Sequence, residues 1–443
     1  MRIDVRRLHR TGPQLAVLAV VMWGLSGFLH PIMSWTAPRA AIQMPPALEI
    51  ETDGASAPST LAAMPSEVRH LRLAPSPGGA YWSVRTDPHT PRLAFNAATG
   101  EPAPEAAREH AVTLARHYAA LPDVPVLTVD EITAFSADYP AINRLLPVTA
   151  VMFDTSDRLT IYVDTGSDRL AAVTNAPRRV MLRVFQSVHT LSFLKPVEPL
   201  RLLVITALTL IFISTVLAGI SLTFTAKGKG LRRWHRYAGL ALALPALAFP
   251  VSGLFHAWVN SSLFAAERPG AALFAPASLD EVPQGRFAHL AATADTEGGL
   301  WRAAEGREAR YFAGDGTDLP LNDAARALSL AGVTSDSVAT LQTRFDGDYG
   351  FASKRLPVWR VETQGGPVFA DPVDGLLAQA GQAGPVAALE GRSFDQLHKW
   401  QFANPLGRDV RDTLMMAVIA ALIALALTGL TFTRRRRRPQ PKR

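Results

Sequence analysis

The chain has 443 residues, a formal net charge of +7 at pH 7 and 48% hydrophobic residues. It contains no cysteine, which excludes disulfides, cysteine-ligated zinc, iron–sulfur clusters and thiol catalysis. Sixteen of the 45 Lys and Arg residues lie in three short segments, at residues 1–10, 227–236 and 434–443. The rest of the chain is net acidic, so the positive charge indicates membrane orientation and not nucleic-acid binding.

Four long stretches without charged side chains predict membrane-spanning helices, each long enough to cross a bilayer. We expect an α-helical membrane protein with four transmembrane helices from an internal duplication and two extracytoplasmic α+β domains. The predicted spans are 11–38, 199–226, 237–266 and 412–433. The alternative for the first of them is a cleaved signal peptide.

The positions of the basic segments predict on which side of the membrane each segment between the spans lies. A loop at 227–236 and a tail at 434–443 are predicted to be cytoplasmic, as is the N-terminus. The two large domains, 39–198 and 267–411, are then outside.

Two stretches carry the same histidine pattern. His9 is followed 21 residues later by His30, and His235 is followed 21 residues later by His256. A helix separates such a pair by about 31 Å, close to the thickness of the hydrocarbon core. Ser-Gly precedes the second histidine by four and three residues in both copies. Each stretch therefore offers one imidazole to each membrane face.

The outer domains each predict one helix and one β-hairpin. In the first domain these are a helix at 104–120 and strands at 147–153 and 159–164. The second domain repeats them at 320–331, 357–363 and 367–371. Residues 40–78 and 268–290, rich in Pro, Ala or Gly, are predicted to be mobile lead-in segments. Five acidic residues are interpreted as turn residues: Asp154, Asp157, Asp164, Asp371 and Asp374.

Further matches extend the duplication through the outer domains. Leu146-Pro147-Val148 matches Leu356-Pro357-Val358, and His189-x-x-x-Phe193 matches His398-x-x-x-Phe402. The offsets fall steadily along the chain from 226 to 208. An ordered series of this kind indicates two copies of one unit.

Histidines at matched positions on facing helices favour haem ligation, because haem iron takes two axial ligands and a helix bundle can supply both. His9 and His235 are predicted to hold one haem at the inner face. At the outer face His30 pairs with His256, or two haems pair these with His189 and His398. The alternative for His189 and His398 is that they anchor the outer domains through hydrogen bonds. The remaining histidines are interpreted as surface residues: His70, His89, His110, His117 and His289.

Three short motifs resemble those of a known protein family: Trp234-His235-Arg236, Ser252-Gly-x-x-His256 and Leu397-His-Lys-Trp-Gln-Phe402. With them the chain resembles the PepSY-associated transmembrane family. The resemblance implies a bacterial inner-membrane protein linked to iron uptake, with PepSY-like outer domains. Some members of the family are di-haem reductases of ferric siderophores. The implied cofactor is haem b, two per chain, and the implied acceptor is a ferric siderophore.

No segment of the sequence predicts a flavin, nicotinamide or nucleotide site, so the electron donor is expected to be a separate cytoplasmic protein or a quinol. We expect a transmembrane haem protein that passes electrons to a periplasmic acceptor. No catalytic residue can be named in the outer domains. The alternatives are a non-enzymatic sensor or partner-binding protein and an iron or siderophore permease.

Overall fold

The computed structural model describes residues 9, 13–143, 145–225, 229–263, 270–296, 298–306, 308–333, 337–346, 348–349, 355–378 and 385–435. The chain divides into two compact units. The helical unit consists of residues 1–36, 180–267 and 381–443, and the sheet unit of residues 37–179 and 268–380. The basic residues at 1–8, at 10, at 227 and beyond 435 lie outside the described residues.

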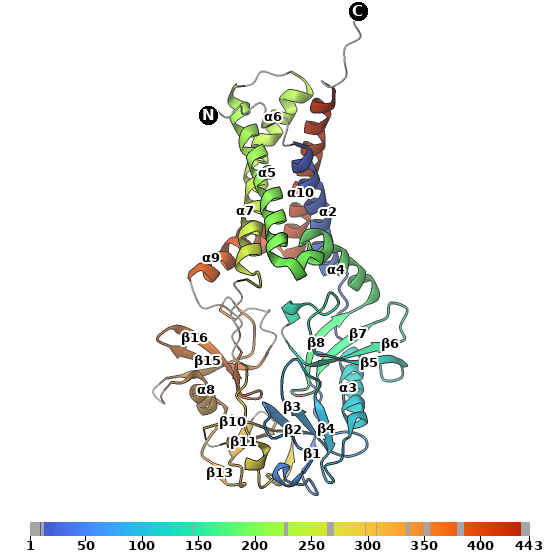
Figure 1. Cartoon of the computed structure of the whole chain (residues 1–443), viewed down its shortest axis with the longest axis vertical. Helices are drawn as coiled ribbons and strands as arrows, with labels where there is room; N and C mark the ends of the chain where they lie inside the picture. Colours follow the sequence, from blue (N-terminus) through green and yellow to red (C-terminus); the bar gives the residue numbers. More distant parts are fainter. Residues whose placement is uncertain are drawn as a thin grey trace, which may run out of the picture. The chain divides into compact units, whose positions relative to one another are not determined.

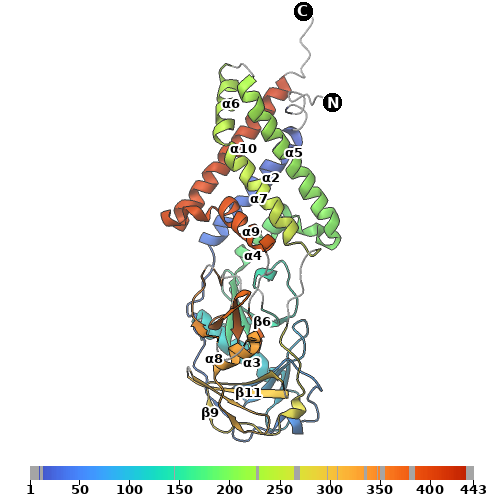
Figure 2. The same ribbon diagram turned by 90° about the vertical axis from the view of Figure 1, so that its left-hand side faces the viewer.

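Long apolar helices and the shorter, basic α6 form the body of the helical unit (Figures 1 and 2). They are α2 (Pro13–Trp35), α5 (Glu198–Thr225), α6 (Leu231–Ala241), α7 (Ala243–Val259) and α10 (Arg408–Arg435). Two shorter helices, α4 (Ala176–His189) and α9 (Pro385–Ser393), lie at the end opposite α6. Three further short helices follow them: η3 (Ser192–Val197), η6 (Phe394–His398) and η7 (Gln401–Leu406).

The prediction of an α-helical protein with four transmembrane helices is wrong. The described chain is mixed α and β, with four sheets, and three of its helical stretches are long and apolar enough to cross a membrane. These are Gln14–Trp35, Ser192–Thr225 and Arg408–Phe432. The predicted span at 237–266 is broken between α6 and α7, which are bent by 52° and give a fourth span only if the pair counts as one.

Proline explains the break. Pro245 lies in the first turn of α7 and has no N–H group, so it cannot bond the carbonyl of Ala241, the last residue of α6. Its fixed φ favours the start of a new helix instead. Uncharged composition alone does not reveal such a break, because it measures transfer into lipid and not helix continuity.

A seven-stranded antiparallel sheet is the centre of the sheet unit, in the order β13-β12-β11-β10-β2-β3-β4. The first half of the sequence supplies β2 (His70–Ala74), β3 (Tyr81–Arg85) and β4 (Leu93–Asn96). The second half supplies β10 (His289–Asp295), β11 (Gly298–Glu305), β12 (Glu308–Phe312) and β13 (Asp318–Leu319). Because β2 pairs with β10, the two halves share one sheet.

The sequence analysis missed this sheet, and the predicted mobile lead-ins are wrong. Residues 40–78 contain β1 (Ile50–Glu51) and β2, and residues 268–290 contain β9 (Arg286–Phe287) and the start of β10. β1 pairs with β9, again across the two halves. Both lead-ins are therefore held by strands that are far away in the sequence, which local composition cannot show.

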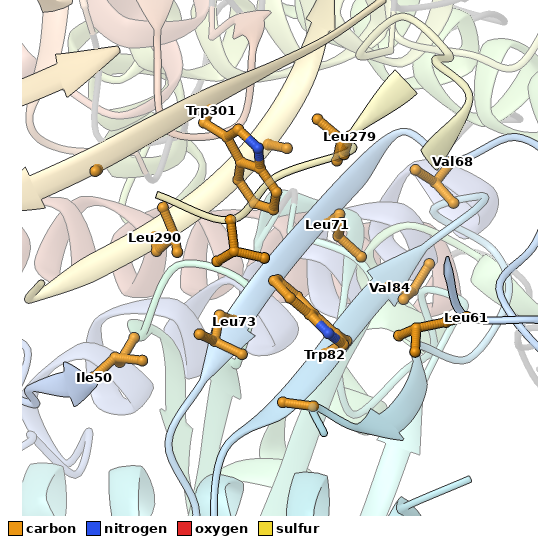
Figure 3. Close-up of a cluster of buried hydrophobic side chains, with 14 of the residues drawn as sticks. Ile50, Leu61, Val68, Leu71, Leu73, Trp82, Val84, Leu279, Leu290 and Trp301 are labelled. Atoms are coloured by element: carbon orange, nitrogen blue, oxygen red, sulfur yellow. The ribbon is translucent and has the colours of Figure 1, made fainter. Parts of the chain in front are cut away.

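The two faces of the seven-stranded sheet differ in chemistry. On one face Trp82 and Trp301 approach to 5.7 Å between ring centroids, within a cluster of buried apolar side chains (Figure 3). Alternation along each strand turns the neighbouring residues to the other face. That face carries the buried polar and charged side chains His70, Arg72, Tyr81, Arg85 and Arg302 and the half-buried His289.

Each half also has a four-stranded antiparallel sheet and a helix. The first is β5 (Val126–Ile132), β6 (Val148–Phe153), β7 (Thr160–Asp164) and β8 (Arg169–Thr174), with α3 (Pro104–Ala119). The second is β14 (Ala339–Gln342), β15 (Val358–Thr363), β16 (Gly366–Asp371) and β17 (Leu376–Leu377), with α8 (Asp323–Ala331). The structure thus confirms the helix and the hairpin predicted for each outer domain.

The two small domains repeat a local contact that the sequence analysis did not identify. Tyr139 donates to the Leu145 carbonyl at 3.0 Å, and Tyr349 donates to the Arg355 carbonyl at 2.9 Å. The pairs are 210 positions apart, like the other matches in this region. Each tyrosine stacks on an aromatic residue of the neighbouring strand, at 4.6 Å for Tyr162 and 4.4 Å for Phe369.

Candidate functional site: the histidines of the helical unit

All six histidines singled out from the sequence belong to the helical unit. Four of them lie on the α4 and α9 side, namely His30 on α2, His189 at the end of α4, His256 on α7 and His398 at the end of η6. His9 precedes α2, and His235 is on α6 and interacts electrostatically with His9.

His189 and His398 face each other. Their ring centroids are 6.3 Å apart and their planes are inclined by 82°. Two imidazoles on one iron need two metal–nitrogen bonds of about 2 Å, which with half of each ring places the centroids about 6 Å apart. The distance between these two rings therefore fits axial ligation of one haem iron.

Hydrogen bonds determine which nitrogen of His189 is available. The Ser26 hydroxyl donates to the Met22 carbonyl at 2.7 Å, so its oxygen accepts from His189 Nδ1 at 3.0 Å. With the proton on Nδ1, the lone pair of Nε2 is available to a metal. The Trp23 indole also donates to the backbone carbonyl of His189, at 3.1 Å, and this fixes the end of α4.

The second repeat holds His398 in the same tautomer. Its Nδ1 donates to the Phe249 carbonyl at 3.1 Å, and a carbonyl can only accept. The Ser252 hydroxyl donates to the Ala248 carbonyl at 2.6 Å and lies 3.4 Å from the same nitrogen. In both histidines Nδ1 therefore donates a hydrogen bond and Nε2 is left available. The two histidines are 209 positions apart in the sequence.

Burial keeps both imidazoles in the neutral form that binds iron. It lowers the pKa of His189 to about 4, with a further contribution from His30. Burial, followed by the neighbouring His189, lowers the pKa of His398 to about 3. Near pH 7 neither ring carries a proton on both nitrogens, so no proton has to leave before a metal binds.

In each repeat a phenylalanine lies between the other outer histidine, His30 or His256, and the histidine of the close pair, His189 or His398. Phe394 stacks on His256 at 3.8 Å and on His398 at 4.7 Å. In the first repeat, Phe185 stacks on His189 at 4.7 Å and lies 6.2 Å from His30. The structure thus brings His189 and His398 together, a pairing that the sequence analysis did not weigh.

Glycines make room for the imidazoles. A side-chain carbon at Gly253 would lie 3.1 Å from His398 Cε1. At the α6 end, a carbon at Gly219 would lie 3.0 Å from His9 Cε1, and one at Gly429 would lie 3.1 Å from His235 Cε1. Gly219 and Gly429 are 210 positions apart, a repeat signal that could have identified both from the sequence.

His9 shares the tautomer of the other two. Its Nδ1 donates to the carbonyl of Thr215 on α5, at 3.1 Å, and this leaves Nε2 available. The backbone of Leu425 on α10, 210 positions after Thr215, is the hydrogen-bonding neighbour of His235. The two rings contact matched glycines on α5 and α10, so the inner pair follows the same repeat as the outer one.

His256 differs from His30 in having a carboxylate partner. Its Nδ1 lies 2.6 Å from Glu390 Oε1, and Glu390 is buried. The position matched to Glu390 in the first repeat, 209 residues earlier, is Met181. The carboxylate is therefore specific to the second copy and is not required by the fold.

Several predictions about the sheet unit are corrected. His70 and His110 are buried and His289 is half-buried, so none of the three is a surface residue. Asp164 and Asp371 do accept bonds from turn N–H groups, at 3.0 and 3.2 Å, but both are also buried and paired with arginines. Among the described residues there is no group of three or more His, Asp or Glu side chains suited to a metal ion.

Comparison with known proteins does not assign the chain. No family model matches it, and no curated protein matches it significantly. The resemblance to the PepSY-associated transmembrane family therefore rests on the motifs alone.

Proposed function

We propose that this protein is a b-type haem protein of a bacterial inner membrane that passes electrons to an acceptor in the periplasm. The observation that supports it best is the His189–His398 pair, with its separation of 6.3 Å and its two Nδ1-protonated rings. A bound haem supplies a one-electron carrier, and bis-imidazole ligation suits electron transfer.

The residues of the chain have distinct roles in this proposal. His189 and His398 hold the outer haem, while Ser26 and the Phe249 carbonyl orient their rings. His9 and His235 hold the inner haem. Electrons enter from a separate cytoplasmic donor or a quinol, since the sequence contains no nicotinamide or flavin motif.

The acceptor is a ferric chelate of the siderophore class, and the small helix-and-sheet domains are PepSY-like. Both statements follow from the family resemblance. One electron reduces Fe(III) to Fe(II), which binds hard oxygen ligands more weakly and leaves the chelate. The sheet unit is periplasmic, and cytoplasmic termini at both ends require that the bent pair α6 and α7 crosses the membrane as one span.

An absorption spectrum of the detergent-purified protein tests the proposal. We expect sharp α and β bands on dithionite reduction and about two haems per chain in the pyridine haemochrome assay. His189→Ala and His398→Ala should each leave one haem, and His117→Ala, a matched control in the sheet unit, should leave two.

Two results would contradict the proposal or its ligand assignment. A colourless protein from cells with ample haem would contradict haem binding and favour a non-enzymatic sensor. If His30→Ala and His256→Ala remove a haem while His189→Ala and His398→Ala do not, the outer ligands are the pair predicted from sequence.

A further inference from the structure

Four arginines meet three carboxylates on the polar side of the seven-stranded sheet. We name Arg85, Arg92, Arg169 and Arg355 the arginine cluster. Arg92 binds Asp164 at 2.8 Å, and Arg169 binds Asp371 at 2.6 Å. Arg355 binds Asp371 at 3.1 Å and also pairs with Asp374. The cluster therefore joins the two sequence halves and carries one more positive than negative charge.

Arg85 is the arginine without a bonded counterion. It is 5% exposed, and no hydrogen bond to its guanidinium is present within the described residues. Its nearest carboxylate oxygen, Asp374 Oδ1, lies 3.8 Å from Nη1, beyond hydrogen-bond distance. Burial, then the charges of Arg92 and Arg355, lower the pKa of Arg85 to about 9. Asp374 is in ion-pair contact at this distance, but a buried guanidinium without a hydrogen-bonded counterion is still unfavourable, and a bound anion would reduce this cost.

Other donors near Arg85 also lack partners. Arg92 bonds Asp164 through Nη2, but its Nε and Nη1 are buried without a partner within the described residues. Both ring nitrogens of His70 also lack a partner, but burial lowers the pKa of His70 well below its usual value, so the ring is neutral and only one nitrogen donates. Asp374 Oδ1 lies 3.9 Å from His70 Nε2, also faces Arg85, and is a buried acceptor without a partner within the described residues. Arg92 and His70 thus have three donors without partners, against two such acceptors on His70 and Asp374, and this excess favours a group that only accepts.

The part of this cluster that remains accessible is cationic. The accessible side-chain fractions are 6% for Arg85, 6% for Arg92, 9% for Arg169 and 12% for Arg355. Asp371 and Asp374 are fully buried. A small solute that reaches the cluster meets guanidinium groups, whose planar fork matches carboxylate and phosphate oxygens.

We propose that the arginine cluster binds one small oxyanion, a carboxylate or a phosphate-type group, with Arg85 as its main contact. Arg92 Nε and Nη1 supply further donors. The bound anion balances the charge excess where the two halves of the sheet unit meet. The site is independent of the haem proposal, because it lies wholly within the sheet unit.

Thermal unfolding of the full-length protein in detergent tests the site. Chloride is replaced by phosphate or by acetate at constant ionic strength, and the midpoint is followed with anion concentration. Wild type should show a saturable rise of several degrees. Arg85→Gln should melt at or above wild type in chloride and should not respond. Arg302→Gln is the control, because Arg302 is equally buried but fully paired with Asp323 at 2.8 Å. It should melt lower and still respond.

A second variant and the choice of anion sharpen the test. Arg85→Lys keeps the charge but not the fork, and should raise the half-saturating concentration at least tenfold. Saturation by phosphate alone identifies an inorganic oxyanion, and saturation by acetate alone identifies a carboxylate-bearing ligand. No saturable shift with either anion, an equal shift with chloride, or a wild-type response in Arg85→Gln would overturn the proposal.

Discussion

At the scale of single residues, the histidine chemistry depends on the partner of Nδ1. A hydroxyl oxygen or a carbonyl accepts from Nδ1 in His9, His189 and His398, so each ring presents the other nitrogen. The sequence identifies the imidazoles and the serines. It does not identify the carbonyls of Thr215 and Phe249, which only the packing of helices brings into reach.

The serine next to the first outer ligand should matter for haem affinity. Ser26→Ala removes the acceptor of His189 Nδ1, whereas His398 keeps the Phe249 carbonyl when Ser252→Ala is made. We expect Ser26→Ala to weaken outer haem retention by about tenfold or more and Ser252→Ala to have a smaller effect. Haem transfer to apomyoglobin measures both, and equal effects would contradict the assigned tautomers.

Gly219 should be intolerant of a side chain. Gly219→Ala places a carbon 3.0 Å from His9 Cε1, while Gly239→Ala meets only Leu425 at 3.8 Å. Alanine otherwise favours a helix by about 1 kcal/mol, so a loss cannot come from helix propensity. The haem content should fall to one per chain in Gly219→Ala and stay at two in Gly239→Ala. An unchanged haem content in both would place the inner site elsewhere.

The buried pair of Arg72 and Asp168 should dominate acid sensitivity of the sheet unit. Burial alone would raise the pKa of Asp168, but Arg72 and His110 outweigh it and hold this pKa well below its usual range. The stability from this pair is therefore present above the unfolded-state pKa of about 3.9 and is lost as pH falls below it.

Asp168→Asn should cost about 3–5 kcal/mol, because it leaves Arg72 buried without its counterion. Asp318→Asn breaks an exposed pair with Arg310 and should cost less than about 1 kcal/mol. Urea unfolding at pH 7 distinguishes them. A similar loss in both variants would show that the buried pair contributes no more than a surface one.

At the scale of elements, the segments around the outer histidines repeat an exposed apolar pattern. Three matched pairs are large and exposed: Val180 and Leu389 at 60% each, Phe193 and Phe402 at 65% and 63%, and Val197 and Leu406 at 54% and 60%. They lie on α4 and α9 and on the η3 and η7 segments that precede α5 and α10, two helices long and apolar enough to cross a membrane. We name these six side chains the apolar rim and expect it to lie in the membrane interface, as amphipathic segments do.

The absence of native cysteine makes the apolar rim easy to probe. Phe193→Cys and Phe402→Cys, each spin-labelled in liposomes, should be accessible to oxygen and protected from a water-soluble nickel chelate. Leu341→Cys, on edge strand β14 of the sheet unit and 53% exposed, should behave in the opposite way. Nickel-chelate accessibility at Phe402 equal to that at Leu341 would exclude lipid contact.

At the scale of the whole molecule, the two halves depend on each other. β2 and β10 are neighbours in the seven-stranded sheet, and Trp82 packs on Trp301 across the same boundary. Either half alone would expose a strand edge and half of an apolar cluster. A repeat in sequence is therefore not an independently folding unit in this protein.

Splitting the chain in the 226–228 segment tests this dependence. We expect residues 1–226 and 227–443, each expressed alone, to be degraded or aggregated, and the coexpressed fragments to copurify. Resistance of a single fragment to limited proteolysis, at the level of the intact protein, would show that the halves fold separately.

The sequence by itself determined the positions of the apolar helices, the hairpins at 148–164 and 358–371, and the matched histidines, because periodicity, turn residues and uncharged length are local properties. It did not determine the break between α6 and α7, the shared sheet or the approach of His189 to His398. The strands of that sheet are short, and the one pairing that joins its two halves, β2 with β10, links residues more than 200 positions apart. Only tertiary packing decides which imidazoles meet and which arginine lacks a hydrogen-bonded counterion, since both depend on contacts between distant segments.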